Sequence, residues 1–419
     1  MIMNPARLQG SDHFLDILDH DMRRHGLPGN IAQLQLHLSA LPNLHHFEER
    51  FQAWVSEEPA CRVILLDGLA RTRRVMNSSG IHPEFRRHQN INAHDVLNWR
   101  LNTPIPRPAH PAFAIDLIEG PEGTTLGLTW DHLLMDARGG EFLLVRFAGR
   151  DKENANTWKP ISPISGLQRL KATRALHPVF KRIGRGVAAP EMPNIHPQLN
   201  VGHLVVDEKE SREIADRGKQ IHPIIGETAL LIAGALRRTH ALCIKVKNSP
   251  SGYMIPVTVS RRSPGSFSPL LGNPISIVYI LAQAAQMEDS TPDTLARHVA
   301  QQFMDALRNG HIEAIEKQLD LSGYLPRAAV SRFLRHLTQG KIASCFFAHT
   351  GRTMFDTLAD FNFHGARVEH VFHQPMVCHP PGLGFFACRH SAKLHLSICS
   401  TDQDPKQLGQ RMMHDLLLL

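Results

Sequence analysis

A histidine and an aspartate stand four residues apart in TWDHLLMDARGGEFLL, residues 129–144. His132 follows an apolar run, and Asp136 comes shortly before two glycines. An imidazole suits general base catalysis because its pKa lies near neutral pH, so it can take a proton from a hydroxyl or an amine. A carboxylate four residues later can fix the turn by pairing with an arginine. The spacing predicts a reactive histidine at a strand end, supported by Asp136.

The elements that position His132 are predicted from apolar periodicity. Residues 111–119 and 124–130 have the pattern of two strands joined by a turn at residues 120–123. The second strand ends just before His132. A strand end is a rigid place that a substrate can reach, which suits a catalytic side chain.

The rest of the chain predicts a mixture of helices and strands. One helix begins at Ser11 or Asp12, and another carries Leu295, Val299, Phe303 and Leu307 on its buried face. We expect helices at 11–25, 44–55, 207–219, 226–240 and 291–309, and strands at 61–66, 199–206, 253–259, 275–282, 366–372, 383–389 and 393–399. The predicted fold class is α/β with mixed sheets.

The length of 419 residues favours two lobes over one core. We expect an N-terminal lobe at residues 1–155, a basic proline-containing crossover at 156–198 and a C-terminal lobe at 199–419. The chain contains no run of 18 apolar residues, so we expect no transmembrane helix. The first residues lack the apolar region of a secretory signal, so we expect none. Six dispersed cysteines are typical of reduced, buried thiols, so the sequence predicts a cytoplasmic protein.

The net charge of +7 is concentrated in part between residues 154 and 190, which hold seven Lys or Arg and no acidic residue. This segment is either a solvated connection or a basic surface for a phosphorylated donor, an acidic carrier protein or a membrane face. We expect Lys171, Arg174, Lys181 and Arg182 to aid capture of the donor or partner. Dispersed charge elsewhere and few aromatic residues argue against nucleic acid as a partner.

Two further features have ordinary structural interpretations. The histidines and the cysteine at positions 364, 370, 373, 378 and 379 could suggest a metal, but their spacing matches no zinc site, so we expect no metal and no cofactor. His132 could be an ordinary core or surface histidine, since the chain has 27 histidines. Asp131 could be a turn residue, or its charge could raise the pKa of His132.

The segment DHLLMDA resembles the HHxxxDG motif of the CoA-dependent acyltransferase and condensation-domain superfamily, which has the chloramphenicol acetyltransferase-like fold. The catalytic second histidine of the motif falls on His132, and the motif aspartate falls on Asp136. Asp131 replaces the first histidine and Ala137 replaces the glycine, so Gly139 and Gly140 are predicted to supply the turn slightly later. These departures put catalytic activity in question.

Other segments along the chain carry the same resemblance. Residues 229–238 are similar to a helix of wax ester synthase/diacylglycerol acyltransferase-type proteins whose Asn-Asp start is Gly226-Glu227 here. IPVTVSRR (255–262), PLLGNPIS (269–276), FAHTGR (347–352), PPGLGFF (380–386) and KLHLSIC (393–399) also match family segments. Many members carry Ser-Asn-x-Gly where this chain has FAHTGR, which keeps the glycine alone. The pattern is nearest to those proteins and to free-standing condensation-like acyltransferases.

The resemblance implies two lobes flanked by helices, with an active-site tunnel between them and His132 near its middle. His132 would deprotonate the acceptor, which would attack the thioester directly without a covalent acyl-enzyme. Asp136 would pair with Arg261 or Arg262. The tunnel neighbours that we expect are Asp131, Asn273 and His349.

The sequence leaves three hypotheses. The first is an acyltransferase that moves an acyl group from CoA or a carrier protein to a hydroxyl or amine. The second is a degenerate binding or docking protein, motivated by Asp131, Ala137 and His349. The third is a peptide-type condensation enzyme with carrier-bound donors. An acyl carrier protein and a peripheral membrane contact are the further partners left open.

Overall fold

The computed structural model describes residues 8–68, 70–77, 81–108, 110–150, 174, 176–177, 181, 187–190, 198–244, 252–263, 266 and 269–417. The expected basic crossover lies almost entirely outside these residues, including Lys171 and Arg182. Arg174 and Lys181 are exposed. The expectation that this segment captures a donor therefore stays a prediction, as do the lobe boundaries.

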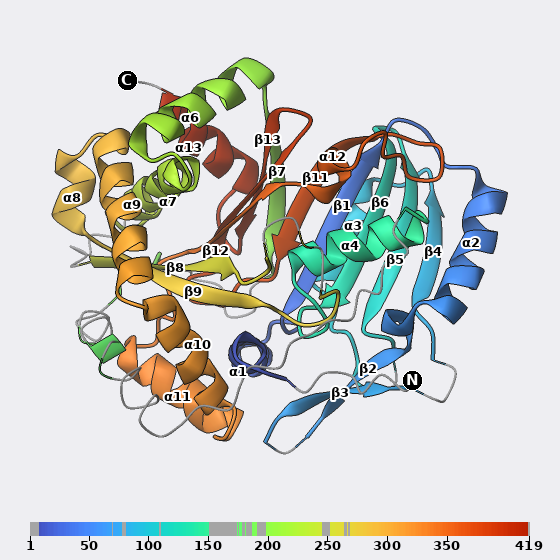
Figure 1. Ribbon diagram of the computed structural model, residues 1–419, viewed down its shortest axis with the longest axis horizontal. Helices are drawn as coiled ribbons and strands as arrows, with labels where there is room; N and C mark the ends of the chain where they lie inside the picture. The colour runs from blue at the N-terminus through green and yellow to red at the C-terminus, as the bar shows by residue number, and fades with distance from the viewer. Residues whose placement is uncertain are drawn as a thin grey trace.

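The first lobe is built on a five-stranded sheet with the order β11-β1-β6-β5-β4. Its strands are β1 Ile31–Leu38, β4 Glu84–Gln89, β5 Phe113–Gly120, β6 Gly123–Asp131 and β11 Val368–Pro375. The helices α2 Leu44–Glu57, α3 Ala93–Leu101 and α4 Ala137–Phe147 surround it, with a ribbon of β2 Val63–Asp67 and β3 Thr72–Met76 (Figure 1). The pairing of β5 with β6 confirms the predicted hairpin that leads to His132.

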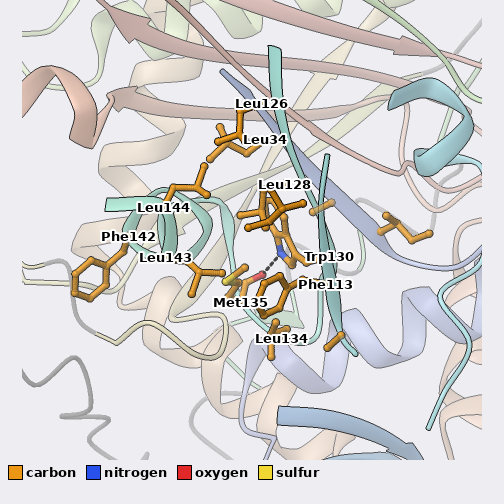
Figure 2. Close-up of a cluster of buried hydrophobic side chains, with 14 of the residues drawn as sticks. Leu34, Phe113, Leu126, Leu128, Trp130, Leu134, Met135, Phe142, Leu143 and Leu144 are labelled. Atoms are coloured by element: carbon orange, nitrogen blue, oxygen red, sulfur yellow. Dashed lines mark hydrogen bonds between the residues drawn. The ribbon is translucent and has the colours of Figure 1, made fainter. Parts of the chain in front are cut away.

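Alternation along the strands sorts the two faces of this sheet. Leu34 of β1 and Leu128 and Trp130 of β6 pack against Leu143 and Leu144 of α4 (Figure 2). Side chains in a strand point alternately to opposite faces, so the intervening positions meet α3 instead. Burying each large apolar side chain contributes roughly 1.5–3 kcal/mol, which holds α4 rigidly on the sheet.

The second lobe has a six-stranded mixed sheet with the order β7-β13-β12-β10-β8-β9. Its strands are β7 Asn200–Val206, β8 Gly252–Ser260, β9 Ile275–Gln283, β10 Phe346–Arg352, β12 Leu383–His390 and β13 Lys393–Ser400. Its helices are α6 Glu208–Ile221, α7 Gly226–Ile244, α8 Ala284–Asp289, α9 Pro292–Arg308, α10 His311–Ser322, α11 Arg327–Leu337 and α13 Pro405–Leu417. The short helix α12 Met354–Thr357, which follows β10, packs on α4 of the first lobe. Strand β10 runs parallel to β12, and β12 runs antiparallel to β13. The predicted two-lobe α/β class with mixed sheets is confirmed.

Two elements join the lobes. Strand β11 comes from the C-terminal part of the chain but pairs with β1 of the first sheet. Helix α1 Ser11–Arg24 lies between the two lobes and contacts α10 and α11 (Figure 1). No described helix is long and apolar enough to cross a membrane. All six cysteines are buried, and none forms a disulfide.

Three details of the predicted elements were wrong. Leu307 is 51% exposed because it lies in the last turn of α9, whereas Leu295, Val299 and Phe303 are buried. The cap of α1 is Gly10, since the Ser11 hydroxyl bonds the carbonyl of Asn273 instead. The expected strand at 61–66 begins only at Val63, after a short 3-10 helix at Pro59–Arg62.

Helix α1 carries buried aspartates that no sequence pattern predicted. Four of them pair with arginines from distant segments: Asp12 with Arg74, Asp16 with Arg327, Asp19 with Arg107 and Asp21 with Arg335. A buried charge is tolerated where a partner compensates it, so these pairs fix α1 against both lobes.

Four histidines gather where β11 approaches β7 and β13. The His37 and His370 rings lie 5.9 Å apart, and His370 Nδ1 lies 3.2 Å from His395 Nε2. His203 stacks on Phe372 with ring centroids 4.2 Å apart. Burial lowers the pKa of His203 to about 4 and that of His395 to about 3. This junction therefore holds neutral imidazoles at neutral pH.

We expect the protein to lose stability as the pH falls from 6.5 towards 4. Unfolding restores an ordinary histidine pKa of about 6.5, so below that pH the unfolded chain binds more protons than the folded one. His395→Leu should flatten the slope of unfolding free energy against pH by about 1.4 kcal/mol per pH unit between pH 4 and 6. Urea denaturation at several pH values measures this slope. An unchanged slope would contradict the assignment, and the exposed His45→Leu is the control.

Candidate active site

A cavity of about 220 Å³ lies between the two lobes, and His132 forms part of its wall. The wall draws on α1, the turn after β6, the start of α4 and strands β1, β8, β9, β10, β11 and β12. Because both sheets contribute, the cavity sits at the junction of the lobes, where the resemblance implied a tunnel. Its opening on both faces stays a prediction.

The backbone around His132 is held by three separate segments. Its amide donates to the carbonyl of Asn30 at 2.8 Å, and the Asn273 side chain donates to its carbonyl at 2.9 Å. The Arg74 Nε donates to the carbonyl of Leu133 at 2.6 Å. Among the described residues His132 Nδ1 has no hydrogen-bond partner. The main chain is therefore rigid, while no described side chain engages that ring nitrogen.

The turn that follows is anchored in the core. The Trp130 indole donates to the carbonyl of Met135 at 2.8 Å (Figure 2). The backbone amide of Gly272 donates to the carbonyl of Leu134 at 2.7 Å, and the backbone amide of Asp136 donates to the carbonyl of Gly272 at 3.2 Å. Leu134 and Met135 are fully buried. These contacts fix the direction in which the chain leaves His132.

Asp136 has two structural partners. Its Oδ1 accepts from the amide of Gly139 at 2.8 Å, which caps α4, and from Arg262 Nη2 at 2.8 Å. Its Oδ2 accepts from Arg262 Nη1, so the pair is bidentate. Arg261 instead lies 2.9 Å from Glu316 on α10. The choice left open by the sequence therefore falls on Arg262, and Arg261 does not support the site.

Gly139 and Gly140 do not supply the turn that was expected of them. Both lie within α4, where a Cβ on Gly139 would come within 2.5 Å of the Leu270 carbonyl oxygen. A Cβ on Gly140 would come within 2.9 Å of the Trp130 ring. The glycines allow α4 to approach its neighbours closely, which keeps Asp136 in reach of Arg262.

The expected tunnel neighbours separate into wall and support. His349 lines the cavity; its Nδ1 lies 2.9 Å from the Thr228 hydroxyl, and burial lowers its pKa. Asn273 lies behind the wall, where it bonds the carboxylate of Asp12 at 2.9 Å as well as His132. Asn273 is thus a positioning residue.

Asp131, one of the tunnel neighbours that we expected, does not line the cavity. Asp131 is buried outside the cavity wall and accepts from Arg107 Nε at 2.8 Å and from the Leu133 amide at 3.1 Å. Burial raises the pKa of Asp131. Its side chain holds the turn, which is one of the two roles that the sequence left open for it.

Sequence reasoning missed a polar group on the same wall. His373 Nε2 lies 2.8 Å from Glu141 Oε1, and Arg138 Nη1 donates to Glu141 Oε2 at 2.8 Å. Arg138 and His373 line the cavity, and Glu141 supports them from α4. The signal available in the sequence was a lone acid in the apolar run GGEFLLVRF.

The remaining wall is mainly apolar. Helix α1 contributes Phe14, Leu15, Leu18 and Met22, and the strands add aliphatic and aromatic side chains such as Ile275, Ile277, Phe346 and Phe386. Among the described residues of the wall, Asp136 is the acidic side chain, and Arg262 neutralises its charge. The cavity therefore suits an apolar ligand with few polar groups.

The histidine and cysteine positions between 364 and 379 do not converge. His364 packs on Phe47 and Phe147, while His370 faces His395 and His373 binds Glu141. Within the described part of the chain, no three His, Cys, Asp or Glu side chains are placed to hold a metal ion.

Comparisons with known proteins identify the fold. No family model and no curated protein matches the sequence. Among solved structures, the trichothecene 15-O-acetyltransferase of Fusarium sporotrichioides has a TM-score of 0.68 at 12% identity, covering 98% of this chain and 94% of that one. Polyketide synthase associated protein 5 of Mycobacterium tuberculosis has a TM-score of 0.63 at 14% identity, covering 99% and 98%.

A third structure is the starter condensation domain of rhizomide synthetase, solved with C8-CoA and Leu-SNAC. It has a TM-score of 0.62 at 13% identity, covering 99% of this chain and 93% of that one. The chain therefore has the chloramphenicol acetyltransferase-like fold of CoA-dependent acyltransferases and condensation domains. The fold predicted from the HxxxD segment is confirmed.

Proposed function

We propose that this protein is an acyltransferase that uses an acyl thioester donor and a hydroxyl or amine acceptor, with His132 as general base. The observation that carries the proposal is the position of His132 on the wall of the cavity between the lobes. Its main chain is fixed by Asn30 and Asn273, and the turn that follows is fixed by the Asp136–Arg262 pair. A base held rigidly at a cavity wall meets the geometric requirement for general base catalysis.

In the proposed reaction His132 takes a proton from the acceptor as its oxygen or nitrogen attacks the thioester carbonyl. The new C–O or C–N bond forms and gives a tetrahedral oxyanion. The C–S bond then breaks, and the proton passes from the imidazolium of His132 to the departing thiolate. The hydroxyls of Thr258 and Ser260 are among the wall groups that could donate to an oxyanion. These steps need no cofactor beyond the thioester substrate.

The character of the wall supports an apolar substrate body. Four side chains of α1 and several from the strands bury apolar surface, and Arg262 neutralises Asp136. An octanoyl chain fits this chemistry, and a structural neighbour was solved with C8-CoA. Octanoyl-CoA is therefore the first donor to test, with octanoyl carrier-protein thioester as the alternative. The cytoplasm remains the location that we propose.

Incubation of the protein with octanoyl-CoA and 1-octanol or octylamine should release CoA in proportion to the protein added. The reason is that a positioned base and an apolar cavity bring acceptor and thioester together. A thiol reagent follows CoA release, and mass spectrometry identifies the ester or amide. A faster reaction with the octanoyl carrier thioester would indicate a carrier-dependent condensation enzyme.

The opposite outcome would support a binding or docking protein. In that case octanoyl-CoA or its carrier thioester would bind, but no CoA would be released above the rate without protein. The replacement of the motif glycine by Ala137, at the cavity wall, is the feature that motivates this alternative.

A further inference from the structure

Glu141 is a buried carboxylate in the apolar face of α4. It is fully inaccessible and accepts from Arg138 Nη1 at 2.8 Å, from the Met354 amide at 2.7 Å and from His373 Nε2 at 2.8 Å. Burial raises the pKa of Glu141, but the charge of Arg138 and the hydrogen bond from His373 outweigh it and lower this pKa to about 2. Burying a charge is costly, so we expect an ionised Glu141 to be bonded to Arg138 and His373 in one fixed arrangement.

The carboxylate fixes the tautomer of His373. An ionised carboxylate only accepts hydrogen bonds, so the facing nitrogen, Nε2, must carry the proton. In a neutral imidazole the other nitrogen, Nδ1, is then an acceptor. His373 Nδ1 has no hydrogen-bond partner among the described residues, although the ring lines the cavity.

His373 marks a place in the cavity separate from His132. On β1, Ile31 pairs with Asp131, which directly precedes His132, while Leu34 pairs with His373. Three strand residues span roughly 10 Å, so the two histidines lie at different levels of the sheet. A ligand that reaches both must extend along the cavity.

We propose that His373 Nδ1 accepts a hydrogen bond from an N–H or O–H group of the substrate that is distinct from the group acylated. Glu141 orients the ring, as carboxylates orient histidines in other sites. The inference rests on the proposed function, because it describes the substrates of the same cavity. The group that donates this hydrogen bond is either an amide of the pantetheine arm or a second polar group on the molecule that is acylated.

Two substitutions at His373 separate this role from a structural one. His373→Gln places an amide nitrogen near the position of Nε2, so it keeps the bond to Glu141 and removes the Nδ1 acceptor. His373→Asn places its amide near the position of Nδ1, so it keeps an acceptor and gives up Glu141. His45→Gln, on the exposed face of α2, is the matched control.

Two measurements with the full chain show which substrate supplies the N–H or O–H group that bonds His373. The first is calorimetric titration with octanoyl-CoA alone. The second compares the Michaelis constants for two acceptors, octane-1,2-diol and 1-octanol, with octanoyl-CoA as donor. We expect His373→Gln to weaken one of these interactions by about tenfold, the effect of one lost hydrogen bond. His373→Asn should recover part of the loss.

The source follows from which measurement changes. Weaker octanoyl-CoA binding identifies the pantetheine arm, and a higher Michaelis constant for the diol alone identifies a second acceptor hydroxyl. Wild-type values for His373→Gln in both measurements would overturn the inference. So would equal losses in His373→Gln and His373→Asn that follow their melting temperatures. If octanoyl-CoA binds through His373 but CoA is never released, the inference stands and the proposed function fails.

Discussion

His132→Ala is expected to lower the rate of octanoyl-CoA-dependent acyl transfer by at least about a hundredfold, the usual contribution of a general base. The substitution removes the proton acceptor at the cavity wall and leaves the backbone contacts to Asn30 and Asn273 in place. The melting temperature should therefore stay close to that of the wild type. Steady-state CoA release and thermal unfolding on the same preparations measure both effects.

The control for this variant is His45→Ala, which removes an exposed histidine of α2 that does not line the cavity. It should keep wild-type turnover and stability. Unchanged acyl transfer in His132→Ala would remove the mechanism. A large loss of stability in the same variant would show that His132 has a structural role.

Asp136→Ala is expected to destabilise the protein by about 3–5 kcal/mol, because Arg262 would remain buried without its partner. The same change removes the cap of α4, since Asp136 accepts from the Gly139 amide. The turn that begins at His132 would lose its contacts with Arg262 and with the Gly139 amide, so activity should fall as well. Chemical denaturation gives the free energy of unfolding.

Arg261→Ala is the matched control, one residue before Arg262. Arg261 is a third exposed and pairs with Glu316 at 2.9 Å, so its loss should cost less than about 1 kcal/mol. Arg262→Ala should resemble Asp136→Ala, since it leaves the carboxylate unpaired. If Arg261→Ala and Arg262→Ala destabilise equally, the bidentate pair is not what holds the turn.

The fold was largely predictable because its strands and helices carry strong local patterns. The hairpin of β5 and β6 has alternating apolar residues and a glycine-rich turn, and α9 has a threonine cap followed by proline. The resemblance of the HxxxD segment to the superfamily motif then indicated the fold. Leu307 was misplaced because periodicity alone does not show where a helix extends beyond its neighbours.

The partners within the site were less predictable, since they depend on contacts far apart in the sequence. The resemblance implied that Asp136 pairs with one of two adjacent arginines, but the course of the chain after β8 turns Arg261 towards α10 and Arg262 towards Asp136. Asp131 was expected to neighbour the tunnel, but it lies outside the cavity wall and pairs with Arg107.

The pair formed by Glu141 and His373 was also hidden from the sequence. It links α4 to β11, which are separated by more than half of the chain. The register of β11 against β1 brings His373 to the cavity wall, and long-range strand pairing has no local signature. A lone acid in an apolar helix was the one available signal.

The most direct test of the central claim is mass spectrometry of a reaction that contains the protein, octanoyl-CoA and 1-octanol, beside the same reaction with His132→Ala. The account predicts octyl octanoate formed with the wild type, almost none with the variant, and no octanoyl group attached to the protein. Equal product from both proteins would contradict His132 as the base. An octanoylated protein that forms and decays at the rate of turnover would contradict direct transfer.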